Sequence, residues 1–401
     1  MRNRAIPGVD LHIVIDRLLS RRQLLGEAAV IAASAVIARA GPQRVALPLQ
    51  PAPSPNLRLP WRGIDASFLP QLEWLGIGFY SGQEQVDVVR LAAAAGINLM
   101  RLRVWVNPAD GFCDTSHTLA MASRAHAAGM KLLIDLHLSD SWADPGQQTK
   151  PAAWAGLSSG ALAQRVSDYA SGVMAALVAQ GTPPAFVQVG NEVTDGLLWP
   201  TGRISISGWG AFASLIKAGI LGVQSAFPAI GQPQILLHID RGGDNGAARW
   251  FYDNALNSGI PFELIGLSYY PWWHGPLDTM AANLNDLATR YQRPVWLVET
   301  SYPWTLAWND NQNNFVGANS QLLPGFPASS AGQSAYLQRL VELLARVPGG
   351  QGQGLCYWAP ENIAVPGIFA SACENLALFD FLRRVLPGLA TLGRGSAPAP
   401  Q

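Results

Sequence analysis

Two glutamates at the ends of short apolar runs are the residues of this chain best suited to chemistry. Glu192 ends the segment Gly190-Asn191-Glu192 after the run 185–189, and Glu299 follows the run 294–298. A carboxylate is costly to bury unless it is paired or hydrogen-bonded, so two strands that each deliver one indicate a shared site. Two carboxyl groups that flank a glycosidic bond can hydrolyse it. The alternative is that the two glutamates are unrelated and each caps a loop.

The composition limits the kind of ligand. Of the 401 residues only 13% are charged, and the formal net charge is zero. A nucleic-acid partner would need a basic surface, so this balance argues against one and fits a neutral, hydrogen-bonding ligand. The chain has 14 Trp, and Trp side chains often line grooves, although any single Trp is more often a core residue.

The first 40 residues predict an export signal of the twin-arginine type. Arg21 and Arg22 precede a Leu-Leu pair, the apolar stretch 26–38 follows, and Ala38-Arg39-Ala40 forms a small-residue cleavage pattern. A membrane anchor is the alternative, but the stretch is short and rich in Ala. We therefore expect cleavage, no membrane association afterwards, and a mature protein that is periplasmic or secreted. Residues 41–57 read as a Pro-rich linker and residues 391–401 as a flexible tail.

Between these ends, strand-like and helix-like segments alternate about eight times. Several of the apolar runs are apolar on both faces, as parallel strands between two layers are. The pattern predicts an α/β fold, a (β/α)8 TIM barrel that forms one catalytic domain over residues 58–390. A doubly wound open sheet is the alternative, but no Gly-rich phosphate loop follows the first strand. The predicted strands are Trp61–Ser67, Leu99–Val106, Lys131–Leu138, Phe186–Glu192, Gln234–Asp240, Leu264–Tyr270, Pro294–Thr300 and Gly354–Ala359.

The predicted helices fill the spaces between these strands, and several end at a glycine, which commonly terminates a helix. They are Gln83–Ala95, Thr118–Ala128, Leu162–Gln180, Gly210–Phe227, Gly246–Ser258, Leu277–Tyr291 and Gly332–Arg346.

Polar residues gather where the predicted strands end, which is the face of such a barrel that carries the active site. Because side chains alternate along a strand, Arg101, Arg103 and Trp105 share one face. The other strand ends carry Asp135 and His137, Asn191 and Glu192, His238 and Asp240, Ser268 to Tyr270, Glu299, and Tyr357 with Trp358.

Opposite strands of the barrel would hold Glu192 and Glu299 on either side of a sugar ring. A separation of about 5–5.5 Å between the carboxyl groups predicts retention of configuration, and about 6.5–9.5 Å predicts inversion. The nucleophile must stay ionised, and Arg101 and a tyrosine hydroxyl from the sixth strand are its natural donors. Asn191 is placed to bind the sugar 2-hydroxyl.

Longer stretches resemble a known family. The Asn-Glu pair and the second Glu are similar to those of the clan of retaining (β/α)8 glycosidases, and residues 62–380 resemble glycoside hydrolase family 53, the endo-β-1,4-galactanases. The segments that carry the resemblance are Arg101–Pro108 (RLRVWVNP), Asp135–Trp154 (DLHLSDSWADPGQQTKPAAW), Val187–Pro200 (VQVGNEVTDGLLWP), Gly266–Gly275 (GLSYYPWWHG), Val298–Thr305 (VETSYPWT) and Gly242–Asn245.

The resemblance implies roles for individual residues. Glu192 matches the acid/base, Glu299 the nucleophile, and Arg101 the arginine that binds the nucleophile. His137 and Asn191 match residues around the sugar at the cleavage point, although His137 could instead be a core histidine satisfied by Asp135. The nucleophile's tyrosine partner matches Tyr269 or Tyr270, and the aromatic platform matches Trp358. Further groove residues are Trp105, Trp142, Asp65, Asn107, Asp144 and Trp304.

The resemblance implies no cofactor, but some members of the family carry calcium in the loop after the seventh strand. Here that loop, Trp308–Phe315, offers a single carboxylate, Asp310, together with amides, whereas calcium usually takes several carboxylates. Three cysteines leave at least one unpaired, and a bridge between Cys356 and Cys373 stays open. No Cys/His spacing resembles a zinc site.

Three functions are therefore compatible with the sequence. The resemblance favours a monomeric, retaining, endo-acting hydrolase of β-1,4-galactan, the side chain of pectic arabinogalactan. A second possibility is another β-glycanase of the same clan that acts on mannan, cellulose or xylan. A third is an inactive barrel that only binds polysaccharide, although both glutamates are present.

Overall fold

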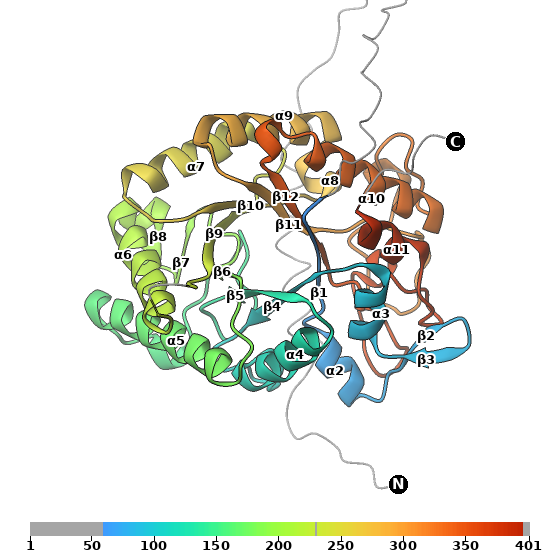
Figure 1. Cartoon of the computed structure of the whole chain (residues 1–401), viewed down its shortest axis with the longest axis horizontal. Coiled ribbons are helices and arrows are strands. Elements are labelled where there is room, and N and C mark those ends of the chain that lie inside the picture. The colour runs from blue at the N-terminus through green and yellow to red at the C-terminus, as the bar shows by residue number, and fades with distance from the viewer. Residues whose placement is uncertain (1–58, 229–230, 396–401) are drawn as a thin grey trace, which may run out of the picture. The chain divides into compact units, whose positions relative to one another are not determined.

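Eight parallel strands close into a barrel in the computed structural model, which describes residues 59–228 and 231–395 (Figure 1). Around the barrel the strands follow the order β1, β12, β11, β10, β9, β6, β5 and β4, and β4 pairs with β1 to close it. The prediction of a (β/α)8 barrel is thus confirmed. The barrel strands are β1 (Trp61–Asp65), β4 (Leu99–Val104), β5 (Lys131–Leu136), β6 (Phe186–Val189), β9 (Gln234–Ile239), β10 (Leu264–Ser268), β11 (Val295–Thr300) and β12 (Gly352–Trp358).

Helices surround the barrel, as Figure 1 shows. Several begin at a side-chain cap: the carboxylates of Asp87, Asp114 and Asp244 each accept a hydrogen bond from a backbone N–H of the first turn. The helices are α2 (Leu69–Trp74), α3 (Val88–Ala95), α4 (Thr115–Ala127), α5 (Ser159–Ala179), α6 (Ile204–Ser225), α7 (Asn245–Asn257), α8 (Pro271–His274), α9 (Leu277–Tyr291), α10 (Ser330–Ala345) and α11 (Pro387–Arg394).

The strands are apolar on both faces because each face packs in a different layer. Outward-facing side chains such as Ile134 and Val187 join the large core beneath the helices. Inward-facing side chains form a smaller cluster that fills the interior of the barrel, with the rings of Phe186 and Trp296 in edge-to-face contact at 4.7 Å. This floor consists of Leu99, Leu133, Phe186, Leu236, Leu264, Trp296, Val298 and Cys356. The barrel is therefore a packed core, and the polar side chains lie beyond it.

Two segments differ from the sequence-based expectation. The sequence predicts residues 83–87 as the start of a helix, but they lead from a hairpin of β2 (Phe79–Ser81) and β3 (Glu84–Val86) to the cap of α3. Gly82, with φ +63°, makes the turn of the hairpin, and the helix begins only after its cap, Asp87. Helix α11 extends past residue 390, where we expected the domain to end, because Leu389 and Leu392 are buried in the core. The predicted signal and linker lie outside the described residues.

Helix α6 is interrupted near its start. Gly208 has φ +75°, which divides the helix after its first turn. A second hairpin, β7 (Gly196–Leu197) with β8 (Gly202–Arg203), precedes it. Among the described residues, α6 is the single helix whose length and apolar composition would suffice to cross a membrane. One side of it, with Phe212, Ile216 and Ile220, packs in the core.

The positions of the thiols show whether Cys356 and Cys373 form a disulfide. Cys113, Cys356 and Cys373 are all free and buried. Cys356 lies in the floor of the barrel, whereas Cys373 packs with Val316 and Leu376 in a separate cluster. No bridge joins them in this structure.

The floor predicts a sensitive position. A Cβ atom at Gly354 would lie well inside van der Waals distance of the Trp296 ring, whereas at Gly317 it would meet nothing within 4 Å. We expect Gly354→Ala to lower the free energy of unfolding by about 1–3 kcal/mol or more through overpacking, and Gly317→Ala to leave it nearly unchanged. Urea unfolding followed by tryptophan fluorescence measures both, and equal midpoints for the two variants would contradict the packing described here.

Candidate active site

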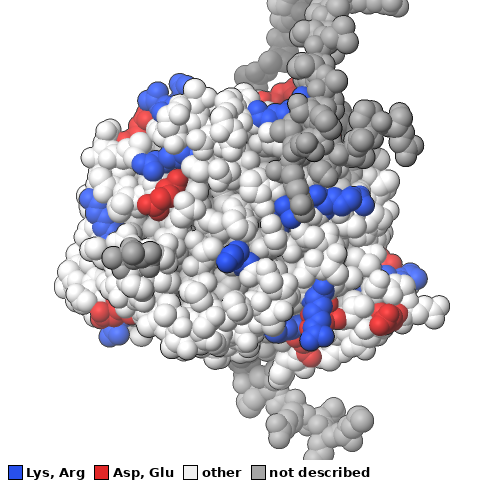
Figure 2. Space-filling model, in the orientation of Figure 1, with Lys and Arg blue, Asp and Glu red and all other residues white. Residues whose placement is uncertain are grey.

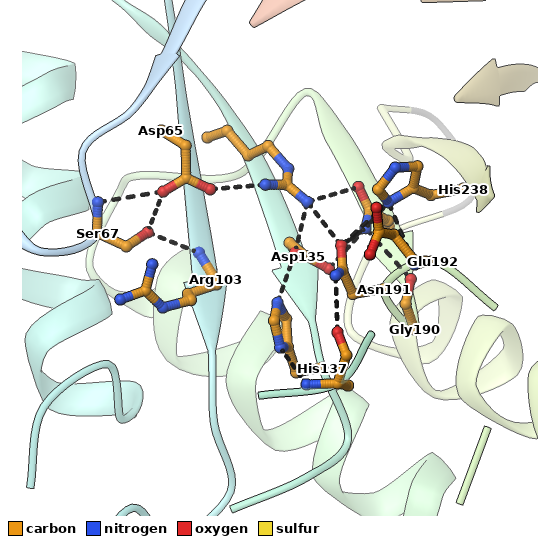
Figure 3. Close-up of polar contacts among 12 residues, drawn as sticks. Asp65, Ser67, Arg103, Asp135, His137, Gly190, Asn191, Glu192 and His238 are labelled. Carbon is orange, nitrogen blue, oxygen red and sulfur yellow. Dashed lines mark hydrogen bonds and ion pairs between the residues drawn. The ribbon is translucent and has the colours of Figure 1, made fainter. Parts of the chain in front are cut away.

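A buried arginine lies at the centre of the polar residues that follow the barrel floor. Arg101, from β4, is 1% exposed. Its Nη1 lies 2.7 Å from Asp65 Oδ2 of β1, and its Nη2 lies 2.7 Å from Asp135 Oδ2 of β5 and 2.9 Å from Glu299 Oε1 of β11. Nη2 also donates to Asn191 Oδ1 at 2.9 Å. One guanidinium thus connects β1, β4, β5 and β11 with the loop after β6. Figure 3 shows Asp65, Asp135 and Asn191 of this cluster.

The charges in this cluster shift one another's pKa values. Burial alone would raise the pKa of Asp135, but Arg101 and then His137 outweigh it and hold that pKa below its usual value. For Glu299 the balance is different. Burial raises its pKa above the ordinary value, Asp135 and Asp65 add to the rise, and Arg101 and Tyr270 oppose it.

An irregularity in β11 directs Glu299 toward Arg101. On one side Leu267 pairs with Leu297 but Ser268 pairs with Glu299, and a register shift also occurs against β12. Val298 is therefore an extra residue in the strand, and it still packs in the barrel floor. Such bulges reorient side chains. The carboxylate of Glu299, 6% exposed as a residue, accepts a 2.9 Å hydrogen bond from the Tyr270 hydroxyl at Oε2.

Glu192 lies in a tight turn directly after β6. Its own φ is +46°, and Gly190 has φ +83°. A left-handed backbone costs a residue other than glycine about 1–2 kcal/mol, so surrounding contacts must hold it. The N–H of Glu192 donates to His238 Nδ1 at 3.3 Å, and the N–H of Val193 donates to the His238 carbonyl at 2.9 Å. Glu192 is 4% exposed and lies beside Asn191 and His238 in Figure 3.

Asn191 connects Glu192 with the arginine cluster. Its Oδ1 accepts hydrogen bonds from Arg101 Nη2 and from Gln188 Nε2, the latter at 3.0 Å, while its Nδ2 donates to the Ala143 carbonyl at 2.9 Å. Gln188 Nε2 also contacts Asp135 Oδ1 at 2.8 Å. The side chain of Asn191 is thereby held in one orientation, and one of its two amide hydrogens remains for a further acceptor.

His137 is held by two neighbours in the same cluster. Its Nε2 lies 3.0 Å from Asp135 Oδ2, and its Nδ1 accepts a hydrogen bond from Trp105 Nε1 at 3.2 Å. The contact with Asp135 is the one that a core histidine would make, but Asp135 itself binds Arg101. The structure therefore links His137 to Arg101 through Asp135, and Trp105 to His137.

Aromatic rings form a second part of the site. Trp142 and Trp358, both half-buried, lie 6.1 Å apart in a T-shaped contact, and Trp358 also meets the ring of Tyr270 at 6.4 Å. The guanidinium of Arg103 lies 4.1 Å from the Phe68 ring centroid and 4.4 Å from that of Trp142. Stacking of this kind is a favourable cation–π contact, and it supports Trp142 from one side.

The other predicted residues lie as follows. Tyr269 donates its hydroxyl to the Gly275 carbonyl, so of the two tyrosines it is Tyr270 that contacts Glu299. Asp144 accepts from the N–H of Gly146. Asn107 is exposed, and its backbone N–H donates to Asp140. Trp304 packs on Phe381 with ring centroids 4.7 Å apart. The roles of these four in binding stay predictions.

Sequence reasoning gave no role to several buried polar residues. Gln188 lies inside an apolar run, and only strand alternation from Phe186 would have placed it in the interior of the barrel. Glu361, in the loop after β12, accepts the Phe68 N–H at 2.9 Å, and burial raises its pKa to about 8. No motif in the sequence points to Glu361 as a site residue, because it lies in a loop after the last strand.

The loop in which the resemblance suggests calcium lies after β11 and contacts the loop after β12. Asp310 accepts from the Ser371 N–H, and Glu374, which the sequence did not connect with this loop, accepts from the Asn309 N–H at 2.6 Å. Burial, with Asp310 adding, raises the pKa of Glu374 to about 7. Among the described residues no group of three or more His, Cys, Asp or Glu could hold a metal.

Figure 2 shows how charged side chains are distributed on one face of the molecule. On the part of this face that the described residues form, charged side chains are sparse and the two signs are interspersed. A basic surface of the kind that nucleic acid requires is not present on it.

Carboxyl groups at the ends of barrel strands, one held by an arginine and a tyrosine, suit the cleavage of glycosidic bonds. Fold and site together assign the chain to the (β/α)8 glycoside hydrolases. Comparison with known proteins narrows this class: the model of glycosyl hydrolase family 53 matches residues 61–392. The chain belongs to this family, which confirms the resemblance noted in the sequence.

Relatives cover most of the chain. An uncharacterised protein of Niallia circulans is 42% identical over 83% of this chain and 93% of its own length. A probable arabinogalactan endo-β-1,4-galactanase A of Aspergillus terreus is 37% identical over 82% of this chain and 93% of its own length. The solved family 53 catalytic domain of Ignisphaera aggregans is 33% identical, with a TM-score of 0.80, over 86% of this chain and 98% of that domain.

The arginine cluster predicts a large loss of stability on removal of its cation. Arg101→Met would leave Asp65, Asp135 and Glu299 buried without their partner, and breaking a buried ion pair costs about 3–5 kcal/mol. Urea unfolding at neutral pH measures the loss. Arg290→Met, which breaks an exposed pair with Asp253, is the matched control and should have little effect. Equal stability of the two variants would contradict the central role of Arg101.

Proposed function

We propose that the protein is an endo-β-1,4-galactanase that hydrolyses its substrate with retention of configuration. The observation that carries this proposal is the connection of the two glutamates: Arg101 binds both Glu299 and Asn191, the residue next to Glu192. The galactan specificity rests on family membership and on relatives such as the Aspergillus terreus protein, a probable arabinogalactan endo-β-1,4-galactanase.

In the first step Glu299 acts as the nucleophile. Its ionised carboxylate attacks the anomeric carbon while Glu192 donates a proton to the glycosidic oxygen, and the bond between that carbon and oxygen breaks. Arg101 and the Tyr270 hydroxyl orient Glu299 and stabilise its charge. The product of this step is a glycosyl ester of Glu299 and a shortened chain that leaves with the proton.

In the second step Glu192, now ionised, removes a proton from water. The resulting nucleophile attacks the anomeric carbon, the ester bond to Glu299 breaks, and both glutamates return to their initial states. Asn191 has one amide hydrogen left after its bond to the Ala143 carbonyl. We assign that hydrogen to the sugar 2-hydroxyl, a contact that strengthens in the transition state.

The aromatic residues are assigned to the polymer. Trp358 and Trp142 present rings beside the two glutamates' cluster, and rings of this kind bind the apolar faces of neutral sugars. Asp65 and His137 complete the polar part around the arginine. The protein needs no cofactor for these steps. We also propose that residues 1–40 direct export, so that the enzyme meets its polymer outside the cytoplasm, and that it acts as a monomer.

Two substitutions test the roles of the glutamates. Glu192→Gln removes the proton donor, whose contribution is about 10²–10⁴-fold, and Glu299→Gln removes the nucleophile, so each should lower the rate on galactan by orders of magnitude. A reducing-sugar assay on galactan, mannan and carboxymethylcellulose measures the rate and the specificity together. Wild-type protein that releases nothing from galactan but cleaves mannan or cellulose would indicate another β-glycanase, and release from none would indicate a binding barrel. Proton NMR of the first product distinguishes retention from inversion.

The pKa of Glu299 predicts the acidic side of the pH profile. The nucleophile must be ionised, so kcat/KM falls as pH decreases through the pKa of Glu299, which burial places above its ordinary value of 4.5. Tyr270→Phe removes a hydrogen bond to the ionised form, raises this pKa further, and should move the acidic limb to higher pH. Tyr269→Phe, whose hydroxyl bonds the Gly275 carbonyl instead, is the control. An unmoved limb in Tyr270→Phe would remove Tyr270 from this role.

A further inference from the structure

His238 is a fully buried histidine at the end of β9 that has no part in the mechanism above. Its Nε2 lies 2.8 Å from Ser268 Oγ of β10, and its Nδ1 lies 2.9 Å from Gln188 Nε2 of β6. The same Nδ1 accepts the N–H of Glu192 at 3.3 Å. The imidazole therefore connects three neighbouring strands with the turn that carries Glu192, as Figure 3 shows for His238, Asn191 and Glu192.

The contacts between His238 and the turn are made with two successive residues. While the ring accepts the N–H of Glu192, the His238 backbone carbonyl accepts the N–H of Val193 at 2.9 Å. The third contact is made by Thr194, two residues after Glu192. Its hydroxyl donates to the carboxylate of Asp240, which lies two residues after His238. The end of β9 thus holds residues 192–194 at three consecutive points, and the first of them is the residue with φ +46°.

The tautomer of His238 follows from its neighbours. Burial, with Arg101 adding, holds the pKa of His238 well below its usual value, so the ring is neutral and carries one proton. Asn191 Oδ1 also lies 3.0 Å from Nδ1, but that oxygen already accepts from Arg101 and Gln188. A proton on Nδ1 would leave the Glu192 N–H without this acceptor. The proton therefore belongs on Nε2, where it is donated to Ser268 Oγ.

We propose that His238 is the positioning residue of the proton donor: through Nδ1 it holds the left-handed backbone of Glu192, and so aims the Glu192 carboxyl at the leaving oxygen. The proposal rests on the role assigned to Glu192 under the proposed function. It separates two supporting systems in one site. Arg101 and Tyr270 orient the nucleophile, whereas His238 orients the acid and makes no ion pair with Glu299.

Two amide substitutions separate the two ring nitrogens. His238→Asn places an amide oxygen near the position of Nδ1, where it can still accept the Glu192 N–H. His238→Gln places its amide near the position of Nε2, where it can still bind Ser268, but it removes the acceptor that Nδ1 provides for the Glu192 N–H. Tyr252→Phe is the matched control. The Tyr252 hydroxyl bonds the carbonyls of Leu237 on β9 and Gly266 on β10, the strands that carry His238 and Ser268, and these contacts do not involve Glu192.

The readout is the dependence of rate on the leaving group. Each variant is assayed on galactan, whose leaving oxygen needs a proton, and on a dinitrophenyl β-galactobioside, whose leaving group departs without one. We expect His238→Gln to lose about tenfold or more on galactan, within the range that general acid catalysis contributes, and little on the dinitrophenyl substrate. His238→Asn should retain most of both rates, and Tyr252→Phe should lower the melting temperature without changing the ratio of the two rates.

Glu192→Ala, assayed in parallel, keeps the two hypotheses distinguishable. If Glu192→Ala shows the leaving-group dependence and His238→Gln loses both rates equally or neither, the role of His238 is wrong and the role of Glu192 stands. If Glu192→Ala shows no such dependence, the assignment of Glu192 as the acid fails, and the inference fails with it.

A measurement on the unmodified protein tests the tautomer even if a variant does not fold. With ¹⁵N-labelled histidine, the ring nitrogens of His238 should show a neutral imidazole with the proton on Nε2 and an unprotonated Nδ1 across the active pH range. A proton on Nδ1, or an imidazolium, would overturn the proposal because Nδ1 could not then accept the Glu192 N–H.

Discussion

The site depends on one buried positive charge. A guanidinium inside a protein is costly unless carboxylates and other acceptors surround it, and Arg101 is surrounded by Asp65, Asp135 and Glu299 from three other strands. The same constraint acts in reverse, because three buried carboxylates this close would repel one another without the cation. The register of the barrel must therefore bring β1, β4, β5 and β11 to one level, and the catalytic geometry follows from that requirement.

Much of this arrangement can be predicted from local patterns in the amino-acid sequence. The alternation of short apolar runs with helices predicts the barrel, because strands buried on both faces must be apolar throughout. The carboxyl ends of those strands predict where polar side chains meet, and Arg101, Asp135, Asn191, Glu192 and Glu299 all come from such ends. Here the fold converts separate sequence positions into neighbours by a rule that applies to every barrel.

The remaining features depend on contacts between distant segments. The bulge at Val298 breaks the two-residue alternation, so alternation alone would have directed Glu299 away from Arg101. The choice between Tyr269 and Tyr270 depends on the path of the chain after β10, and the left-handed turn at Glu192 depends on acceptors supplied by β9. Residues 83–87 likewise suit a helix locally, yet the hairpin and the cap at Asp87 exclude them from one.

The floor of the barrel has a consequence for how such a sequence can change over time. Trp296 occupies the space that a side chain at position 354 would need, so the indole and Gly354 form a single packing unit on adjacent strands. Position 354 cannot gain a side chain alone: a larger residue there is tolerated only after the indole has been replaced by something smaller. Homologues with a larger residue at 354 should therefore carry a smaller side chain at 296, and an ancestor with that smaller side chain would have been free to change at 354.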